Sequence, residues 1–308
     1  MIPMWAVLAA ASLGAAGAWI GARIALRVSP RPLLRVNVEG KEVPAVLGWG
    51  LLDGVLLSAG AMTAYIAYRN ADGVWSQCVP APGEICTLDL VLVSTLLGWL
   101  PLIPVSGMFL AGTWDDLRGD ERPRGFAGHL GALRGGAVTG GIVKLVAGAA
   151  VALMTISALA GWEIPPILDW LIAAAPIALA ANLWNLLDRA PGRALKAFLL
   201  CAAPLLLVGE WRVMAAGMVG AAVALLPLDL KAKGMLGDAG ANPLGAMIGL
   251  GMVLAITRLA EDSVFPRGWL ALIVVVLLVL NLASERWSFS AVIERTPWLA
   301  RLDHLGRK

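Results

Sequence analysis

Charged side chains are scarce in this sequence. Only 15% of its 308 residues are Asp, Glu, Lys or Arg, whereas an ordinary soluble protein has about 25%. Hydrophobic residues account for 59%, the mean hydropathy is +0.79, and apolar runs recur at the length of ~20 residues that crosses a bilayer core. The sequence therefore excludes a soluble enzyme with one anchor and predicts an all-α, polytopic membrane bundle of about nine to ten transmembrane helices.

The first apolar run, MWAVLAAASLGAAGAWIGARIAL, has no basic region ahead of it. A cleaved signal peptide carries such a region, so this run is predicted to be a retained first span. Nine spans are predicted at approximately 4–26, 46–68, 89–111, 137–158, 166–187, 193–208, 212–228, 240–258 and 269–284. Residues 1–284 then form a transmembrane domain, and residues 285–308 form a cytoplasmic amphipathic segment.

The basic residues are distributed unevenly between the loops. One set of alternate loops, including the C-terminal segment, holds 19 of the 24 Lys and Arg residues. Because cytoplasmic loops carry an excess of Lys and Arg, this set is predicted to be cytoplasmic. The N-terminus is therefore expected outside and the C-terminus in the cytoplasm.

Cysteines are few, and two of the three lie together. Cys201 falls within the predicted span 193–208, where it is expected to be a small packing residue. Cys78 and Cys86 both lie in the predicted external loop QCVPAPGEICTLDL, on the oxidising side of the membrane. A disulfide between them is predicted, and the alternative is two free thiols.

The unusual polar groups gather in four segments on the predicted cytoplasmic side. These segments are RVNVEGKEVPAVLGWG (35–50), GTWDDLRGDERPRGFAGHL (112–130), NLWNLLDRAPGR (182–193) and DLKAKGMLGDAGANPLG (229–245). Taken singly, each admits a structural interpretation as a helix cap or a turn. Taken together, carboxylates that converge against Arg and Lys predict a site for a divalent metal ion and phosphate groups.

These segments resemble the motifs of a known family. GTWDDLRG is similar to an Asp-Asp motif at the cytoplasmic end of a span, NLWNLLDRAPG resembles N-x-x-N-x-x-D-G-x-D-G, and GMLGDAGANPLG resembles F-M-G-D-x-G-S-x-x-L-G. NVEGKEVPAVLGWG is a weaker match to an early K-x-x-P-T-x-G-G region. Order and spacing agree from about residue 35 to 250. The chain is identified as a divergent member of the polyprenyl-phosphate N-acetylhexosamine-1-phosphate transferases, of the glycosyltransferase family 4 type. That family includes phospho-N-acetylmuramoyl-pentapeptide transferase and undecaprenyl-phosphate GlcNAc-1-phosphate transferases.

The resemblance implies a multi-pass transferase of the bacterial cytoplasmic membrane whose active site faces the cytoplasm. It would move a sugar-1-phosphate from a nucleotide sugar, UDP-linked by analogy, to a polyprenyl phosphate such as undecaprenyl phosphate, for cell-envelope glycan synthesis. The implied cofactor is Mg²⁺, with Mn²⁺ as an alternative. The implied partners are these two substrates, membrane lipids and a second copy in a homodimer, and nucleic acid is not among them.

The resemblance also implies roles for individual residues. The catalytic residues would be Asp115, Asp116 and Asp238, with Asp115 handling the lipid phosphate and with Asp238 and Asp116 holding the metal. Substrate-binding residues would be Lys41, Arg124, His129, Lys144, Asn182, Asn185 and Asp188. Lys144 lies within a predicted span, where pairing with Asp115 or a phosphate would stabilise its charge. The alternative is that Lys144 extends to the membrane interface, and His129 is equally consistent with an ordinary loop histidine.

The chain departs from the family pattern at several positions. Arg189-Ala190-Pro191 replaces the segment that holds the second Asp of the third motif, and Ala45 and Ala241 replace Thr and Ser. A His-rich motif is also missing, since the chain has only two histidines. These differences argue against a muramoyl-pentapeptide donor. They leave open another sugar nucleotide, or a weakened or inactive relative that binds polyprenyl phosphate or scaffolds envelope enzymes.

Two further alternatives depend on single features. A transporter would use the intramembrane residues Asp53 and Lys144 as pathway residues, but transporters often contain inverted repeats and no repeat is found here. The C-terminal segment SERWSFSAVIERTPWLARLDHLGRK is predicted to be an interfacial amphipathic helix suited to anionic headgroups. Its alternative role is to help form the sugar pocket.

Overall fold

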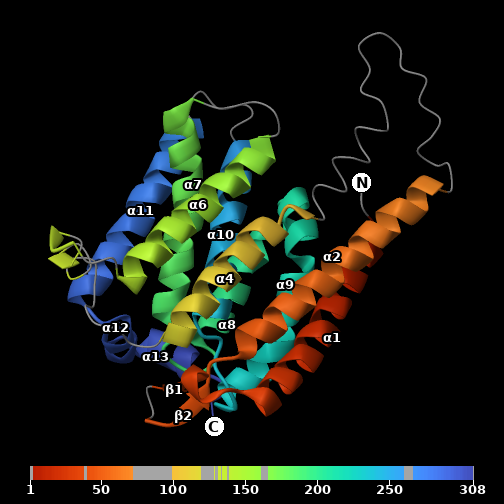
Figure 1. The fold of residues 1–308 in the computed structure, drawn as a ribbon. Coiled ribbons are helices and arrows are strands. Elements are labelled where there is room, and N and C mark those ends of the chain that lie inside the picture. The colour runs from red at the N-terminus through yellow and green to blue at the C-terminus, as the bar shows by residue number, and fades with distance from the viewer. Residues whose placement is uncertain are drawn as a thin grey trace.

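A computed structural model describes residues 3–37, 40–71, 99–118, 128, 131–132, 134–136, 139–160, 166–259 and 266–307. The described helices are α1 (Met4–Val28), α2 (Leu47–Ala71), α4 (Leu102–Arg118), α6 (Gly140–Ala160), α7 (Ile167–Leu187), α8 (Arg193–Leu205), α9 (Gly209–Leu230), α10 (Asp238–Leu259), α11 (Pro266–Arg286), α12 (Phe289–Arg295) and α13 (Pro297–His304). Seven helices in this part of the chain are long and apolar enough to cross a membrane. The prediction of an all-α polytopic bundle is confirmed (Figure 1).

The count of nine spans remains a prediction. Seven of the expected spans correspond to the seven candidate helices. The expected span 89–111 is described only from residue 99, where α4 continues to Arg118. The expected span 193–208 corresponds to α8, which has 13 residues and is therefore about 20 Å long, shorter than a bilayer core of about 30 Å.

The two chain ends lie at opposite ends of the bundle. The N-terminus is at the end where α1 begins, and the C-terminus is at the end where α12, α13 and a small hairpin gather (Figure 1). This arrangement agrees with the expectation that the termini lie on opposite sides, and the assignment of each end to a side of the membrane remains a prediction. The end with the C-terminus is called the polar end below.

Helix α10 is the central helix of the bundle. It packs against α2, α4, α7, α8, α9 and α11, and 83% of its apolar window is buried. Its Gly and Ala residues permit this, because small side chains let neighbouring backbones approach closely in a membrane bundle. Helix α10 is consequently enclosed by neighbouring helices along much of its length.

A short antiparallel hairpin, which the sequence interpretation did not predict, lies at the polar end. It pairs β1 (Leu34–Val36) with β2 (Glu42–Pro44) and follows the 3₁₀ turn η1 (Arg31–Leu33). The main-chain N–H of Met235 donates to Pro44 O at 2.9 Å, and Leu47 N–H donates to Met235 O at 3.0 Å. The hairpin therefore fixes the loop that leads directly into α10.

Candidate functional site

Carboxylates from three segments meet at the first turn of α10. Asp238 begins this helix, Asp115 and Asp116 lie in the last turn of α4, and Asp188 follows the end of α7. An acidic residue is favoured at a helix N-terminus because the free N–H groups there carry partial positive charge. The structure thus brings together four of the residues predicted to form the site, from positions up to 123 residues apart.

Asp116 is held by the backbone of α10. Its side chain is 6% exposed, and its Oδ2 accepts a hydrogen bond from Ala239 N–H at 3.0 Å. The carbonyl oxygen of Asp116 accepts from the Arg35 guanidinium group in β1. Asp116 therefore joins α4, α10 and the hairpin: its carboxylate contacts α10 and its main-chain carbonyl contacts the hairpin.

Lys144, four residues after the start of α6, lies between two of the carboxylates. Its Nζ contacts Asp238 Oδ2 and lies 3.4 Å from Asp115 Oδ2. The side chains of Asp115 and Asn185 also lie close enough to Asp238 to interact with it. The side chains of Asp115 and Asp238 remain 30% and 19% exposed, so both can be reached from outside the protein.

Asp188 connects the third motif to the loop before α10. Its Oδ2 accepts from Gly237 N–H at 2.9 Å, one residue before Asp238. Burial, together with the nearby charges of Asp229 and Asp238, raises the pKa of Asp188 well above its ordinary value. A hydrogen-bond donor or a cation placed beside Asp188 would therefore stabilise its ionised form.

Other predicted residues lie elsewhere or outside the described residues. The Nδ2 of Asn182 donates to Asn281 Oδ1 on α11 at 2.6 Å, so Asn182 contacts α11 and not the Asp238 cluster. Lys41 is exposed in the hairpin turn, where its main-chain N–H donates to Asn37 Oδ1 at 3.0 Å. Four residues lie outside the described part of the chain: Arg124, His129, Cys78 and Cys86. The roles expected of them, including the disulfide, remain predictions.

Two contributors were not predicted as site residues. Arg35 was recognised only as one basic residue among many, although it binds the Asp116 carbonyl. Asp229, near the end of α9, is 2% exposed, and its Oδ2 has no hydrogen-bond partner within the described structure. Both residues lie in the polar segments identified from the sequence. Their spacing in the sequence, however, does not predict which residues they contact.

A cavity of about 10 Å³ lies beside the cluster. Its lining includes Asn37, Asp188, Pro191, Asp229 and Met235. This volume suits a single water molecule. A larger ligand would therefore bind outside this cavity, and the partly exposed side chains of Asp115 and Asp238 offer the accessible part of the site.

The donor set fits a hard divalent cation. The cluster holds four carboxylates, and the described cations that contact it are Lys144 and Arg35. Mg²⁺ prefers carboxylate oxygens together with water and phosphate oxygens. An excess of acidic oxygen ligands at an accessible helix N-terminus, with a lysine beside them, is therefore suited to binding a metal and phosphate groups together.

A comparison with protein-family models gives one match, to glycosyl transferase family 4, over residues 98–257. The matched region covers just over half of the chain and contains the four clustered carboxylates, Lys144 and Asn185. No curated protein matches the chain. The resemblance drawn from the motifs is confirmed, and the chain belongs to glycosyl transferase family 4, as a multi-pass membrane transferase.

Proposed function

We propose that this protein transfers a sugar-1-phosphate from a nucleoside diphosphate sugar to a polyprenyl phosphate. A phosphate oxygen of the lipid attacks the β-phosphorus of the donor and forms the new P–O bond. The bond from that phosphorus to the oxygen bridging to the α-phosphate breaks. Nucleoside monophosphate leaves with the bridging oxygen, and a polyprenyl diphosphate sugar remains.

The observation that carries this proposal is the arrangement of Asp115, Lys144 and Asp238. An ammonium group beside two accessible carboxylates can bind a phosphate by its charge, while a carboxylate accepts a proton. Phosphoryl transfer requires positioning and charge neutralisation more than a covalent intermediate. These side chains therefore supply the charge and the proton acceptor that the reaction requires, and no nucleophile from the protein is needed.

The roles divide between the exposed and the buried carboxylates. Asp115, whose side chain is more exposed than that of Asp238, orients or deprotonates the lipid phosphate. Asp238 and Asp116 would hold Mg²⁺ or Mn²⁺, and Asp188 with Asn185 would border the nucleotide side. When bound, the metal would neutralise charge on the donor's phosphates.

The altered third motif is compatible with catalysis. Although Pro191 replaces a residue of the motif, Asp188 still accepts from Gly237 N–H, and Asn185 still contacts Asp238. The first half of the motif therefore keeps its contacts to the loop before α10. This favours an active transferase with a different donor over an inactive relative.

The proposal is tested with the purified chain in detergent. Undecaprenyl phosphate, Mg²⁺ and a panel of UDP-sugars are supplied, and release of UMP is measured with and without the lipid. Lipid-dependent release with at least one donor is expected. Lipid-independent release, or no release with any donor in the panel, would refute the reaction for those donors.

Replacing Lys144 is expected to lower activity strongly. Lys144→Gln leaves Asp115 and Asp238 without their shared cation and removes a charge from the phosphate site. A fall in kcat of about 10²–10³-fold is expected, since this is the usual loss for one electrostatic contact at a reacting centre. Lys144→Arg, which keeps the charge, should retain more activity than Lys144→Gln.

Lys233→Gln is the matched control for Lys144. Lys233 has an exposed side chain at the same end of the bundle, so its replacement should change the rate less than about twofold. Equal rates for Lys144→Gln and Lys233→Gln would show that Lys144 does not take part in phosphate binding at the site.

A further inference from the structure

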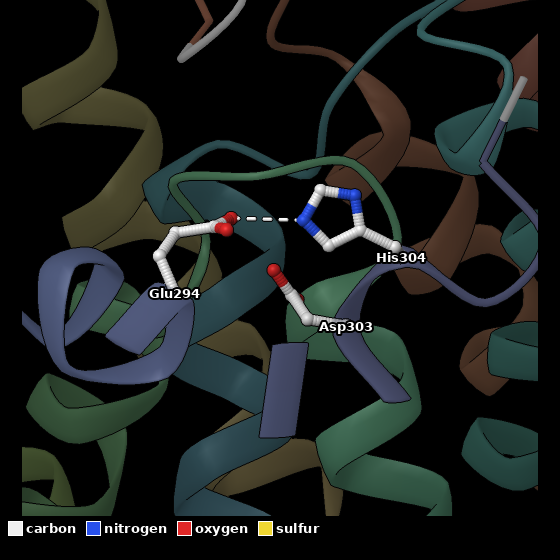
Figure 2. A group of neighbouring side chains, drawn as sticks. All are labelled: Glu294, Asp303 and His304. Carbon is white, nitrogen blue, oxygen red and sulfur yellow. Dashed lines mark hydrogen bonds and ion pairs between the residues drawn. The ribbon is translucent and has the colours of Figure 1, made fainter. Parts of the chain in front are cut away.

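A second cluster of polar side chains lies on the C-terminal helices. Glu294, Asp303 and His304 have potential ligand atoms within 4.8 Å of one another, and Figure 2 shows His304 bonded to Glu294 with Asp303 beside them. However, Arg193 donates to both oxygens of Asp303, at 2.9 and 2.7 Å. Arg307 lies 2.6 Å from Oδ1 of the same carboxylate. Two guanidinium charges on one carboxylate oppose a metal ion here, so the contact is better suited to docking the C-terminal helices.

The Arg193–Asp303 pair is buried. Each of the two residues is 6% exposed, and Arg193 Nη1 also donates to Ser290 Oγ on α12 at 2.7 Å. Burial alone would raise the pKa of Asp303, but hydrogen bonds and charge from Arg193 and Arg307 outweigh it and hold that pKa below its ordinary value. Asp303 is therefore ionised at neutral pH, and the fork-shaped pair is fully formed.

Lys196, on α8, secures the end of α13. Its Nζ donates to the carbonyl oxygens of Leu302 and Leu305 at 2.9 and 3.2 Å, and also to that of Asp303. The last carbonyls of a helix have no partners within the helix, and they carry partial negative charge that favours a cation. Arg193, Lys196, Asp303 and Arg307 are together called the C-terminal clasp.

The clasp also holds the loop that follows Asp188. Arg307 Nε donates to the carbonyl oxygen of Pro191 at 2.9 Å. Gly192, at a φ of +71°, lies so close to α9 that a Cβ there would be 2.9 Å from Leu230 Cγ. Loop 188–193 therefore contacts α9 at Gly192 and the C-terminal segment at the carbonyl oxygen of Pro191. This loop contains the residues that depart from the family motif.

We propose that the C-terminal clasp positions loop 188–193, which begins with Asp188 on the proposed nucleotide side of the site, through the Arg193–Asp303 pair and the bond from Arg307 to Pro191. The inference rests on the proposed function. The contacts run from Asp303 through the loop to Asp188, and from Asp188 to Gly237 beside Asp238. Asp303 and Arg307 act as positioning residues, since they contact neither Asp115 nor Asp238 in these interactions. The clasp determines how well the donor binds and leaves the lipid side of the site unchanged.

Two variants of the full-length chain test this inference. Arg307→Ala removes the bond to Pro191 but leaves the buried Arg193–Asp303 pair in place, so it is expected to fold. Asp303→Asn removes the charge that both guanidinium groups share, and Asp303→Glu restores it. Glu294→Gln is the matched control, because Glu294 is exposed on α12 and pairs with His304.

Three quantities are measured: the KM for the nucleotide sugar, the KM for undecaprenyl phosphate, and hydrogen exchange of the backbone amides of residues 186–190, 192 and 193. Arg307→Ala and Asp303→Asn should raise the donor KM about tenfold, speed exchange in this segment about tenfold, and leave the lipid KM within about twofold. Asp303→Glu should recover part of the donor KM, and Glu294→Gln should match the wild type.

Each outcome decides one question. Unchanged donor KM and unchanged exchange in folded Arg307→Ala would refute the clasp, whether or not Asp303→Asn folds. A parallel loss for both substrates would also refute it, because that pattern indicates general destabilisation. If the wild type releases no UMP, the proposed function fails, and unchanged exchange in Arg307→Ala would still separately refute the contact to the loop.

Discussion

Asp238→Asn is expected to abolish nucleoside monophosphate release, by about 10³-fold or more, while the chain remains folded. Asp238 is the acidic residue of the first turn of α10, and it contacts Lys144, Asp115 and Asn185. The substitution keeps the shape of the side chain but removes the charge proposed to hold the metal. The lost charge relieves repulsion from Asp115 and Asp116 but also removes the ion pair with Lys144. Because these two changes oppose each other, the chain should remain folded. The rate of UMP release and the thermal unfolding temperature in detergent measure the two effects.

Asp169→Asn is the control for this substitution. Asp169 is in the first turn of α7, at the other end of that helix from Asn185, and pairs with Arg267 at 2.6 Å. The same chemical change there should leave the rate within about twofold, because the Arg267 side chain is 68% exposed and exposed ion pairs contribute little. An Asp238→Asn variant that kept the rate of Asp169→Asn would exclude Asp238 from the metal site.

Gly112→Ala is expected to lower both activity and stability, through the contact of α4 with α10. A Cβ on Gly112 would lie 2.6 Å from Ala239 N, and closer still to the carbonyl group of Asp238. The two helix backbones would have to separate, and Asp115 and Asp116 would move away from Asp238. A displacement of about 1 Å at a reacting centre costs about 10²-fold in rate, and overpacking costs about 1–3 kcal/mol in stability. Steady-state kcat and thermal unfolding test both expectations.

The matched control for this variant is Gly60→Ala, in the interior of α2. A Cβ on Gly60 meets no atom within 4 Å, and alanine is favoured over glycine inside a helix by up to about 1 kcal/mol. Gly60→Ala should therefore keep full activity with equal or higher stability. If Gly112→Ala behaved in the same way, the close approach of α4 to the start of α10 would be disproved.

The helices could be predicted because hydropathy is a local property. The expected spans 4–26 and 166–187 correspond to α1 (Met4–Val28) and α7 (Ile167–Leu187). The run 193–208 was more difficult, since its first residues include Arg193 and Lys196, which contact helices about 100 residues later in the chain. Contacts of that kind have no local signal in the sequence, so they could not be used to distinguish a full span from the 13-residue helix α8.

The candidate site could be predicted in part for the same reason. Asp115, Asp116, Asp188 and Asp238 were identified because they lie in the polar segments and match the acidic positions of the family motifs there. Asn182, Asn185 and Asp188 recur every three residues, but six residues of helix leave a rotation of about 120°. That rotation separates Asn182, which contacts Asn281 on α11, from Asp188, which contacts Gly237. The pairing of Arg193 with Asp303 spans 110 residues and could come only from the structure.

The central claim is that the donor's β-phosphate moves to the lipid together with the sugar. A UDP-sugar labelled in its β-phosphate distinguishes this reaction from ordinary glycosyl transfer, in which the diphosphate stays on the nucleotide. Wild-type protein is incubated with an accepted labelled donor, undecaprenyl phosphate and Mg²⁺, and the lipid and nucleotide fractions are separated and counted. The proposed reaction predicts label in the lipid fraction and unlabelled UMP. Label that remained in UDP would contradict it.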